Sequence, residues 1–232
     1  MITMYRYILF FLIFSFCGWL MEVIFKFIQN GKFVNRGFLV GPVCPIYGVC
    51  GIIFYFIFSN ISYNFLSVFI ISFLLCAFVE YFASYILEEL FHARWWDYSH
   101  KRFNLNGRIC LRNLLFFGAM GWFCVYFFNS FVLDFIDSIS LLYSVTLAYI
   151  LLPLFIIDIV VSVQLVSNLK DMISFVKKDA TEEISKKIKT ILLSKSIYFR
   201  RIIYAYPNFR FSPKYLNDLK DRITKHKKRR KS

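Results

Sequence analysis

The sequence predicts an all-α, polytopic membrane protein with five transmembrane helices and a basic tail. Of its 232 residues, 59% are hydrophobic and 21% are aromatic, and the mean hydropathy is +0.58. The apolar residues form continuous runs, which is typical of membrane spans rather than of soluble domains. Charge is uneven as well, because residues 170–232 hold 19 of the 28 Lys and Arg residues but 6 of the 14 Asp and Glu residues.

Five apolar runs predict the spans, and each is long enough to cross a bilayer. They lie at about residues 7–27, 43–61, 65–87, 109–128 and 141–166. No small-residue cleavage site closes the first run, so we expect a retained helix rather than a signal peptide. Pro45 fits the first turn of the second span, and Pro153 predicts a kink in the fifth. Residues 1–166 are thus the predicted transmembrane domain, and 167–232 the predicted cytoplasmic tail.

The distribution of Lys and Arg predicts the orientation. The first and third loops carry basic residues, among them Lys32, Arg36, Arg94 and Arg108, whereas the second and fourth loops carry none. Cytoplasmic loops are enriched in Lys and Arg, so this alternation predicts an outside N-terminus and a cytoplasmic C-terminus. We therefore expect a multi-pass protein of a bacterial inner or plasma membrane.

The connections differ in character. Residues 30–45 are rich in Gly and Pro yet apolar, which fits either a surface turn or a re-entrant segment whose backbone is satisfied by protein or water. Residues 88–112 form a large hydrophilic loop, and residues 129–140 are predicted to be a short acidic connection. In the tail, apolar residues spaced by three or four from Leu169 onward predict a basic amphipathic helix.

Three acids within the predicted spans, Glu22, Glu80 and Asp158, are the strongest functional signal. A lipid-facing acid costs at least ~2.5 kcal/mol, so each should face the helix bundle. Glu80, Ser84 and Glu88 share one helix face. We expect a polar cavity open to the cytoplasm, although structural ion pairs would also account for these acids. The cavity candidates are Glu22, Asn35, Arg36, Glu80, Trp95, Trp96, Asp97, Tyr98, Asn104, Asn106, Arg108 and Asp158.

Other site classes have little support in the sequence. The Trp95-Trp96 pair also fits an interfacial anchor. Six scattered cysteines without a CxxC pair, together with three histidines, favour neither a disulfide framework nor a metal site. The chain has no GxxxxGK[ST], HExxH or GxSxG motif, so no cofactor is predicted and catalytic residues remain unknown.

Several long motifs carry a resemblance to a known family. They are FCGWLME at 16–22, GKFVNRGF at 31–38, GPVCPIYG at 41–48, RWWDY at 94–98 and FNLNGRI at 103–109. Together they resemble the bacterial family of putative ABC-transporter permeases of CmpB type, also called putative ABC-transporter type IV, over about residues 7–128. The resemblance implies a membrane subunit that works with a separate ATPase.

Three functions remain open on the sequence. The first is a permease-like transporter subunit of unknown substrate, whose partners are membrane lipid, an ATPase subunit and a second copy of the chain. The second is a membrane-embedded enzyme or lipid-handling protein acting on a phosphate-bearing lipid at the inner leaflet, with Arg36 and Arg108 on the phosphate. The third is a non-catalytic scaffold that docks through its tail. Nucleic-acid binding is not expected, since membrane attachment already accounts for the basic charge.

Overall fold

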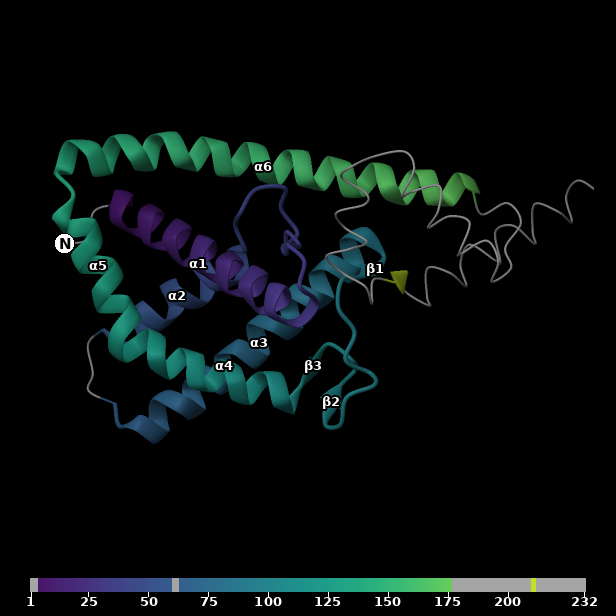
Figure 1. Ribbon diagram of the computed structural model, residues 1–232, viewed down its shortest axis with the longest axis horizontal. Helices are drawn as coiled ribbons and strands as arrows, with labels where there is room; N and C mark the ends of the chain where they lie inside the picture. Colours follow the sequence, from purple (N-terminus) through teal and green to yellow (C-terminus); the bar gives the residue numbers. More distant parts are fainter. Residues whose placement is uncertain (1–3, 60–62, 177–209, 212–232) are drawn as a thin grey trace, which may run out of the picture. The chain divides into compact units, whose positions relative to one another are not determined.

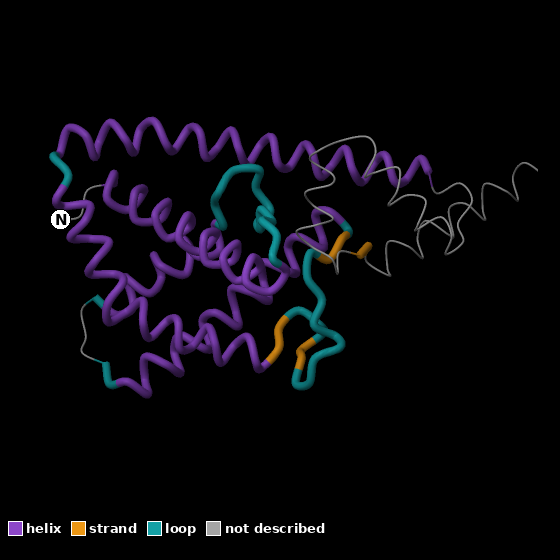
Figure 2. Tube along the Cα trace, in the orientation of Figure 1, coloured by secondary structure: helices purple, strands orange, loops and turns teal. Residues whose placement is uncertain are grey.

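The structure, a computed structural model, describes residues 4–59, 63–176 and 210–211. It confirms the all-α class (Figure 1). The helices are α1 (Met4–Asn30), α2 (Pro45–Phe58), α3 (Phe65–Phe91), α4 (Leu111–Phe123), the π-helix η1 (Cys124–Phe128), α5 (Asn129–Ser138) and α6 (Leu141–Val176). The strands are short, and Figure 2 shows them within the loop segments: β1 (Ala93–Arg94), β2 (Asn104–Leu105), β3 (Ile109–Cys110) and β4 (Arg210–Phe211).

Four helical segments in the described part of the chain are long and apolar enough to cross a membrane. They are Met4–Gln29, Phe65–Phe91, Leu111–Ser138 and Leu141–Ser167. Large apolar side chains on them are exposed, such as Leu74 at 59% and Phe78 at 60% on α3. Such surfaces suit lipid rather than water, so the protein is a multi-pass membrane protein.

The predicted second span, 43–61, is shorter than expected. Its helix α2 has 14 residues, or roughly 21 Å at 1.5 Å per residue. A bilayer core is about 30 Å thick, so the count of five spans is not confirmed. Pro45 does begin this helix, as predicted from its missing N–H.

The predicted acidic connection at 129–140 is wrong. Helix continues through η1 and α5 to Ser138, and only Ile139 and Ser140 separate α5 from α6. The acids do not end the helix because they lie on its exposed face: Asp134 and Asp137 are exposed, whereas Val132 and Ile136 are each 1% exposed. The fourth span is therefore longer than its purely apolar stretch.

The chain forms two compact units. The first comprises residues 1–83 and 98–162, and the second residues 84–97 and 163–232. In the first unit, buried residues of α1, α5 and α6 form an apolar cluster that includes Phe10, Phe14, Val132 and Ala148. Glycine brings helices close together, since a Cβ at Gly48 of α2 would overlap Ser15 of α1.

A β-hairpin stands in the first unit immediately before α4. β2 pairs with β3 in antiparallel register, Leu105 opposite Ile109. The turn contains Asn106 and Gly107, with φ of 54° and 68°, a backbone region that Asn and Gly tolerate best. The hairpin thereby fixes where the third loop ends and the fourth span begins.

The second unit holds the other half of the third loop. β1 pairs with β4, Ala93 opposite Phe211. The Nε of Arg94 donates to Glu88 Oε2 at 2.8 Å. α6 extends to Val176, and the amphipathic tail helix predicted beyond it lies outside the described residues. The orientation and the boundary between domain and tail stay predictions.

Candidate functional site

Glu22 of α1 is the first centre of polar contacts. Its Oε2 accepts from the Nε of Arg36 at 3.2 Å, and its Oε1 accepts from the Tyr47 hydroxyl at 2.8 Å. The ion pair is partly buried, with exposed side-chain fractions of 20% for Arg36 and 28% for Glu22. The acid thus ties the first loop and α2 to α1, and the predicted pairing of an intramembrane acid with a basic residue is observed here.

Asn35 organises the first loop. Its Oδ1 accepts from the indole Nε1 of Trp19 at 2.6 Å, and its Nδ2 donates to the Val40 carbonyl at 3.1 Å. The Cys44 amide donates to the Ser15 carbonyl at 2.9 Å. Since α1 and the loop itself satisfy these groups, the segment meets the condition for backbone that enters a bilayer.

Asp158 of α6 holds the same loop from the other side. Its Oδ1 accepts from the Val40 amide at 3.0 Å, and the Gly41 amide reaches both carboxylate oxygens at 3.1 and 3.0 Å. Ser162 donates its hydroxyl to Asp158 at 3.3 Å and accepts from the Val40 amide at 2.9 Å. A Cβ at Gly41 would lie 2.7 Å from Asp158 Oδ2, so glycine permits this approach.

Glu80 of α3 is the second centre. Its Oε1 accepts from the Tyr98 hydroxyl at 3.3 Å, and the residue is 6% exposed. Glu22 is close enough to act electrostatically on both Glu80 and Tyr98. Burial, followed by the charge of Glu80, raises the pKa of Tyr98 above its ordinary value. The phenol therefore stays protonated and remains a donor to Glu80.

The β2–β3 hairpin is attached to α3 beside Glu80. Asn106 Nδ2 donates to the Tyr81 hydroxyl at 3.0 Å, and the Arg108 guanidinium lies 5.6 Å from the centre of the Tyr81 ring. Asn104 has a local role, since its Oδ1 accepts from the Gly107 amide at 3.0 Å inside the turn. Of these three predicted residues, Asn106 and Arg108 connect the loop to the acid-bearing helix, and Asn104 shapes the turn.

Trp95, Trp96 and Asp97 belong to the second unit. Trp95 is 3% exposed and packs edge-on against Phe91 at a centroid distance of 6.3 Å. Asp97 is 8% exposed. The role of these three residues in a cavity stays a prediction.

Four partners of the predicted residues were missed by sequence reasoning: Trp19, Tyr47, Tyr81 and Ser162. Each places a hydroxyl or an indole N–H within or beside an otherwise apolar helix. Such groups need a partner when they are buried. Tyr47 and Tyr81 also lie next to predicted motifs, GPVCPIYG and Glu80, and that proximity was the available signal.

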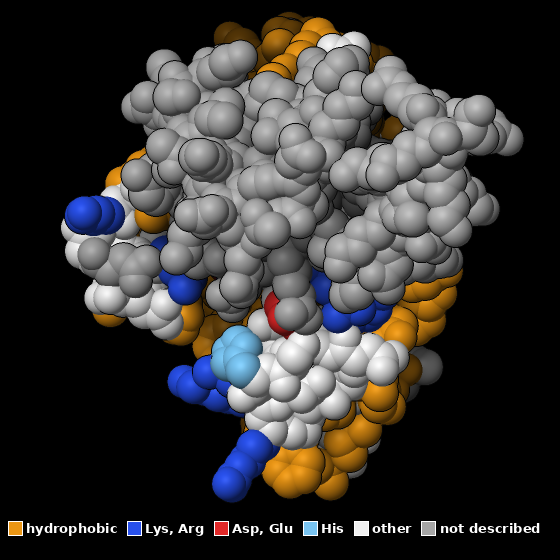
Figure 3. Space-filling model, turned by 90° about the vertical axis from the view of Figure 1, so that its right-hand side faces the viewer, with side chains coloured by type: hydrophobic (Ala, Val, Ile, Leu, Met, Phe, Trp, Pro, Cys, Tyr) orange, Lys and Arg blue, Asp and Glu red, His pale blue; other side chains and the backbone are white. Residues whose placement is uncertain are grey.

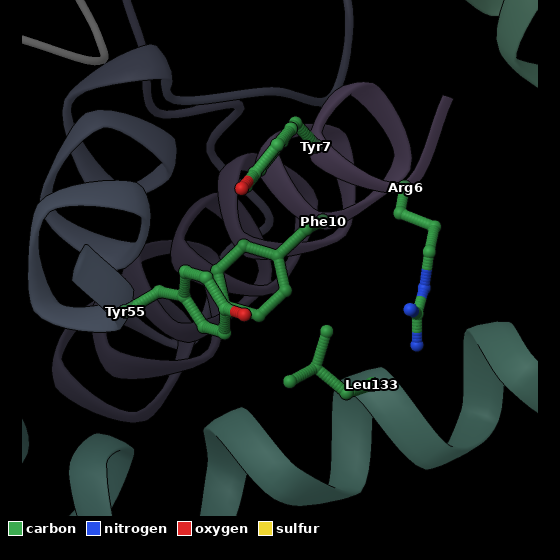
Figure 4. Close-up of a pocket in the computed structure, with 5 residues that line it drawn as sticks. All are labelled: Arg6, Tyr7, Phe10, Tyr55 and Leu133. Atoms are coloured by element: carbon green, nitrogen blue, oxygen red, sulfur yellow. The ribbon is translucent and has the colours of Figure 1, made fainter. Parts of the chain in front are cut away.

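A small pocket lies away from these acids. It is lined by Arg6, Tyr7 and Phe10 of α1, Tyr55 of α2 and Leu133 of α5 (Figure 4). The lining is mainly aromatic, and Arg6 forms an ion pair with Asp137. The pocket brings together none of the residues predicted for the cavity.

The surface near the hairpin is basic and partly apolar. Viewed from the side on which β2 and β3 are drawn, Lys and Arg side chains project at several points (Figure 3). The described exposed residues of the loop include His100, Lys101 and Arg102. Phe103 and Leu105 are 80% and 55% exposed. A basic and apolar surface of this kind suits a membrane interface or a protein partner.

Comparison with known proteins places this arrangement in a family. The family described as putative ABC-transporter type IV matches residues 9–163, which contain every candidate residue discussed above. The chain belongs to this family. No curated protein and no solved structure matches the chain. Family membership makes it an ABC-transporter-related membrane protein and confirms the resemblance carried by the sequence motifs.

Proposed function

We propose that the protein is a permease-like membrane subunit of an ABC transporter and that its substrate route passes the polar cluster around Glu22 and Glu80. The observation that carries the proposal is the convergence of the first loop, α2 and Tyr98 on two acids of membrane-spanning helices. Polar groups at membrane depth are costly and typically mark a substrate or ion pathway. Family membership supplies the transporter context.

The cluster opens to the cytoplasm in this proposal. Arg36, Lys101, Arg102 and Arg108 all belong to the two loops nearest the cluster, and the positive-inside rule assigns such loops to the cytoplasm. Glu22 and Glu80 then lie in the cytoplasmic halves of α1 and α3. A substrate entering or leaving here would meet the Arg36–Glu22 pair first, because that pair is more exposed than Glu80.

The ATPase partner would bind the β2–β3 hairpin. This chain has no nucleotide-binding motif, so a transporter requires a separate ATPase. Phe103 projects from the hairpin with 80% exposure beside exposed Lys101 and Arg102. An exposed aromatic residue flanked by basic residues is a typical anchor of a protein interface.

Mild-detergent purification followed by mass spectrometry of bound proteins tests this function. We expect a stoichiometric ATPase with the wild-type chain and loss of that ATPase in Phe103→Ser. Tyr143→Ser is the matched control, because Tyr143 is 72% exposed at the start of α6. Recovery of the wild-type chain without any ATPase would contradict the proposal, and equal retention by both variants would contradict the hairpin as its docking site. Native mass spectrometry of the same sample measures whether the chain is a dimer.

The enzyme hypothesis gains less from the structure. It assigns Arg36 to a substrate phosphate, but the Nε of Arg36 is bound to Glu22. The scaffold hypothesis depends on the tail, most of which lies outside the described residues. Neither has an observation equal to the cluster around the two acids.

A further inference from the structure

Glu80 differs from the other acids of the described spans in one respect. Its Oε1 accepts one hydrogen bond, from Tyr98, whereas its Oε2 is buried without a hydrogen-bond partner in the described part of the chain. The residue as a whole is 6% exposed. A buried carboxylate oxygen without a donor loses its hydration and gains nothing in exchange.

The electrostatic surroundings increase this cost. Among the described residues, the ion pairs are Arg6–Asp137, Arg36–Glu22 and Arg94–Glu88, so no basic residue pairs with Glu80. The groups that face it are Tyr98, which donates a hydrogen bond, and Glu22, which repels a negative charge on it. Tyr47 and Cys76 also interact electrostatically with Glu80, and neither carries a positive charge.

Arg36 does not resolve the imbalance. It is engaged with Glu22, whose second oxygen accepts from Tyr47. Two adjacent carboxylates therefore share the surroundings of one guanidinium in the interior of a membrane protein. Two neighbouring carboxyls rarely both stay ionised without a further positive charge.

We propose that Glu80, supported by Glu22 and Tyr98, is an intramembrane binding site for one exchangeable monovalent cation, either a proton or an alkali ion. The cation occupies Oε2 of Glu80, and Tyr98 holds Oε1 in place. This proposal deepens the transporter function, in which uptake and release of a positive charge would accompany passage of substrate. The site itself requires only the contacts of the folded chain.

Carbodiimide labelling of the wild-type protein in lipid nanodiscs tests the site. Dicyclohexylcarbodiimide reacts with a protonated carboxyl in an apolar environment: the carboxyl oxygen bonds to the central carbon, the proton moves to nitrogen, and acyl migration leaves a stable N-acylurea with no leaving group. Peptide mass spectrometry measures the adduct at Glu80. We expect labelling to fall about tenfold between about pH 5.5 and about pH 8.5 if the cation is a proton.

An alkali ion gives a different result. At fixed pH and constant ionic strength, replacing a bulky organic cation with sodium or potassium should then reduce labelling of Glu80, because the bound ion keeps the carboxyl ionised. Either dependence supports the site and distinguishes its two occupants. Labelling that is absent throughout, or that ignores both pH and alkali ions, would overturn the proposal, since Glu80 would then be a fixed structural group.

Matched acids and one variant complete the design. Glu89 is exposed on the same helix and should show no comparable protected labelling, and Glu80→Gln provides the blank for the adduct. In Glu22→Gln the neighbouring negative charge is removed, so labelling at Glu80 should disappear at lower pH than in wild type. An unchanged profile in that variant would overturn the role of Glu22. The assay needs no ATPase, so a failed purification of the partner leaves its outcome intact.

Discussion

Asp158 and Glu80 are both acids of membrane-spanning helices, but their surroundings differ. Asp158 accepts from two backbone amides and a serine hydroxyl, and both of its oxygens are used. Glu80 accepts from one phenol and leaves one oxygen without a described donor. The number of donors therefore separates an acid that holds a loop in place from an acid that can exchange a ligand.

Removing the loop anchor should have the largest effect. Asp158→Ala leaves the amides of Val40 and Gly41 without their carboxylate, which we expect to cost about 3 kcal/mol of unfolding free energy. Trypsin should then cleave faster after Lys32 or Arg36 in the released loop. Unfolding in detergent and timed proteolysis measure the two effects. Asp134→Ala, at an exposed acid of α5, is the control, and equal behaviour of the two variants would refute the anchor.

Tyr98→Phe should have a smaller effect that depends on pH. Loss of its hydrogen bond to Glu80 should cost about 1 kcal/mol near neutral pH. Burial raises the pKa of Tyr98 in the folded chain, so the unfolded chain ionises first, at about pH 10, and wild-type stability falls above that pH. The variant should lose less stability over the same alkaline range. Parallel stability curves for the two proteins would contradict this account.

Glu80→Gln should change stability by less than about 1 kcal/mol, because its amide oxygen still accepts from Tyr98 and no buried charge remains. Transport should nevertheless be lost, since a glutamine cannot bind and release the cation. Thermal unfolding and a transport assay in vesicles separate the two effects. A variant as unstable as Asp158→Ala would show that both acids are structural, and the comparison between them would fail.

Asp137→Asn should have the smallest effect. Asp137 pairs with Arg6, but its side chain is 50% exposed, and exposed ion pairs contribute about 0–1 kcal/mol. We expect a change near the lower end of that range, measured by the same unfolding assay. A loss comparable to that of Asp158→Ala would mean that pairing alone, rather than the number of buried donors, determines the role of an acid.

Hydropathy predicted the membrane class well because span length and exposed apolar surface follow from residue type alone. The same reasoning placed Glu22, Arg36, Glu80 and Tyr98 among the candidates, and the structure joins Glu22 to Arg36 and Glu80 to Tyr98. It failed at residues 129–140, where two acids were interpreted as a loop. Helical periodicity, with Val132 and Ile136 on one face, was the better guide there.

Long-range partners were beyond the reach of local patterns. The Gly41 amide and Asp158 are 117 residues apart, and nothing in either segment names the other. Tyr47 was likewise treated as part of an apolar run, although its hydroxyl completes the surroundings of Glu22. Packing of the helices decides which polar groups meet, and a single sequence does not record that packing.

The π-helix η1 has a consequence for how the fourth span can change over time. Its bond from the Asn129 amide to the Cys124 carbonyl encloses one residue more than an α-helical turn. Deleting one residue here would restore α-helical spacing and rotate the following segment by about 100°. Val132 and Ile136 would leave the apolar cluster, while Gly121 would keep its place beside Ser72. The span therefore has two faces with separate phases, and this turn tolerates point substitution better than any change in length.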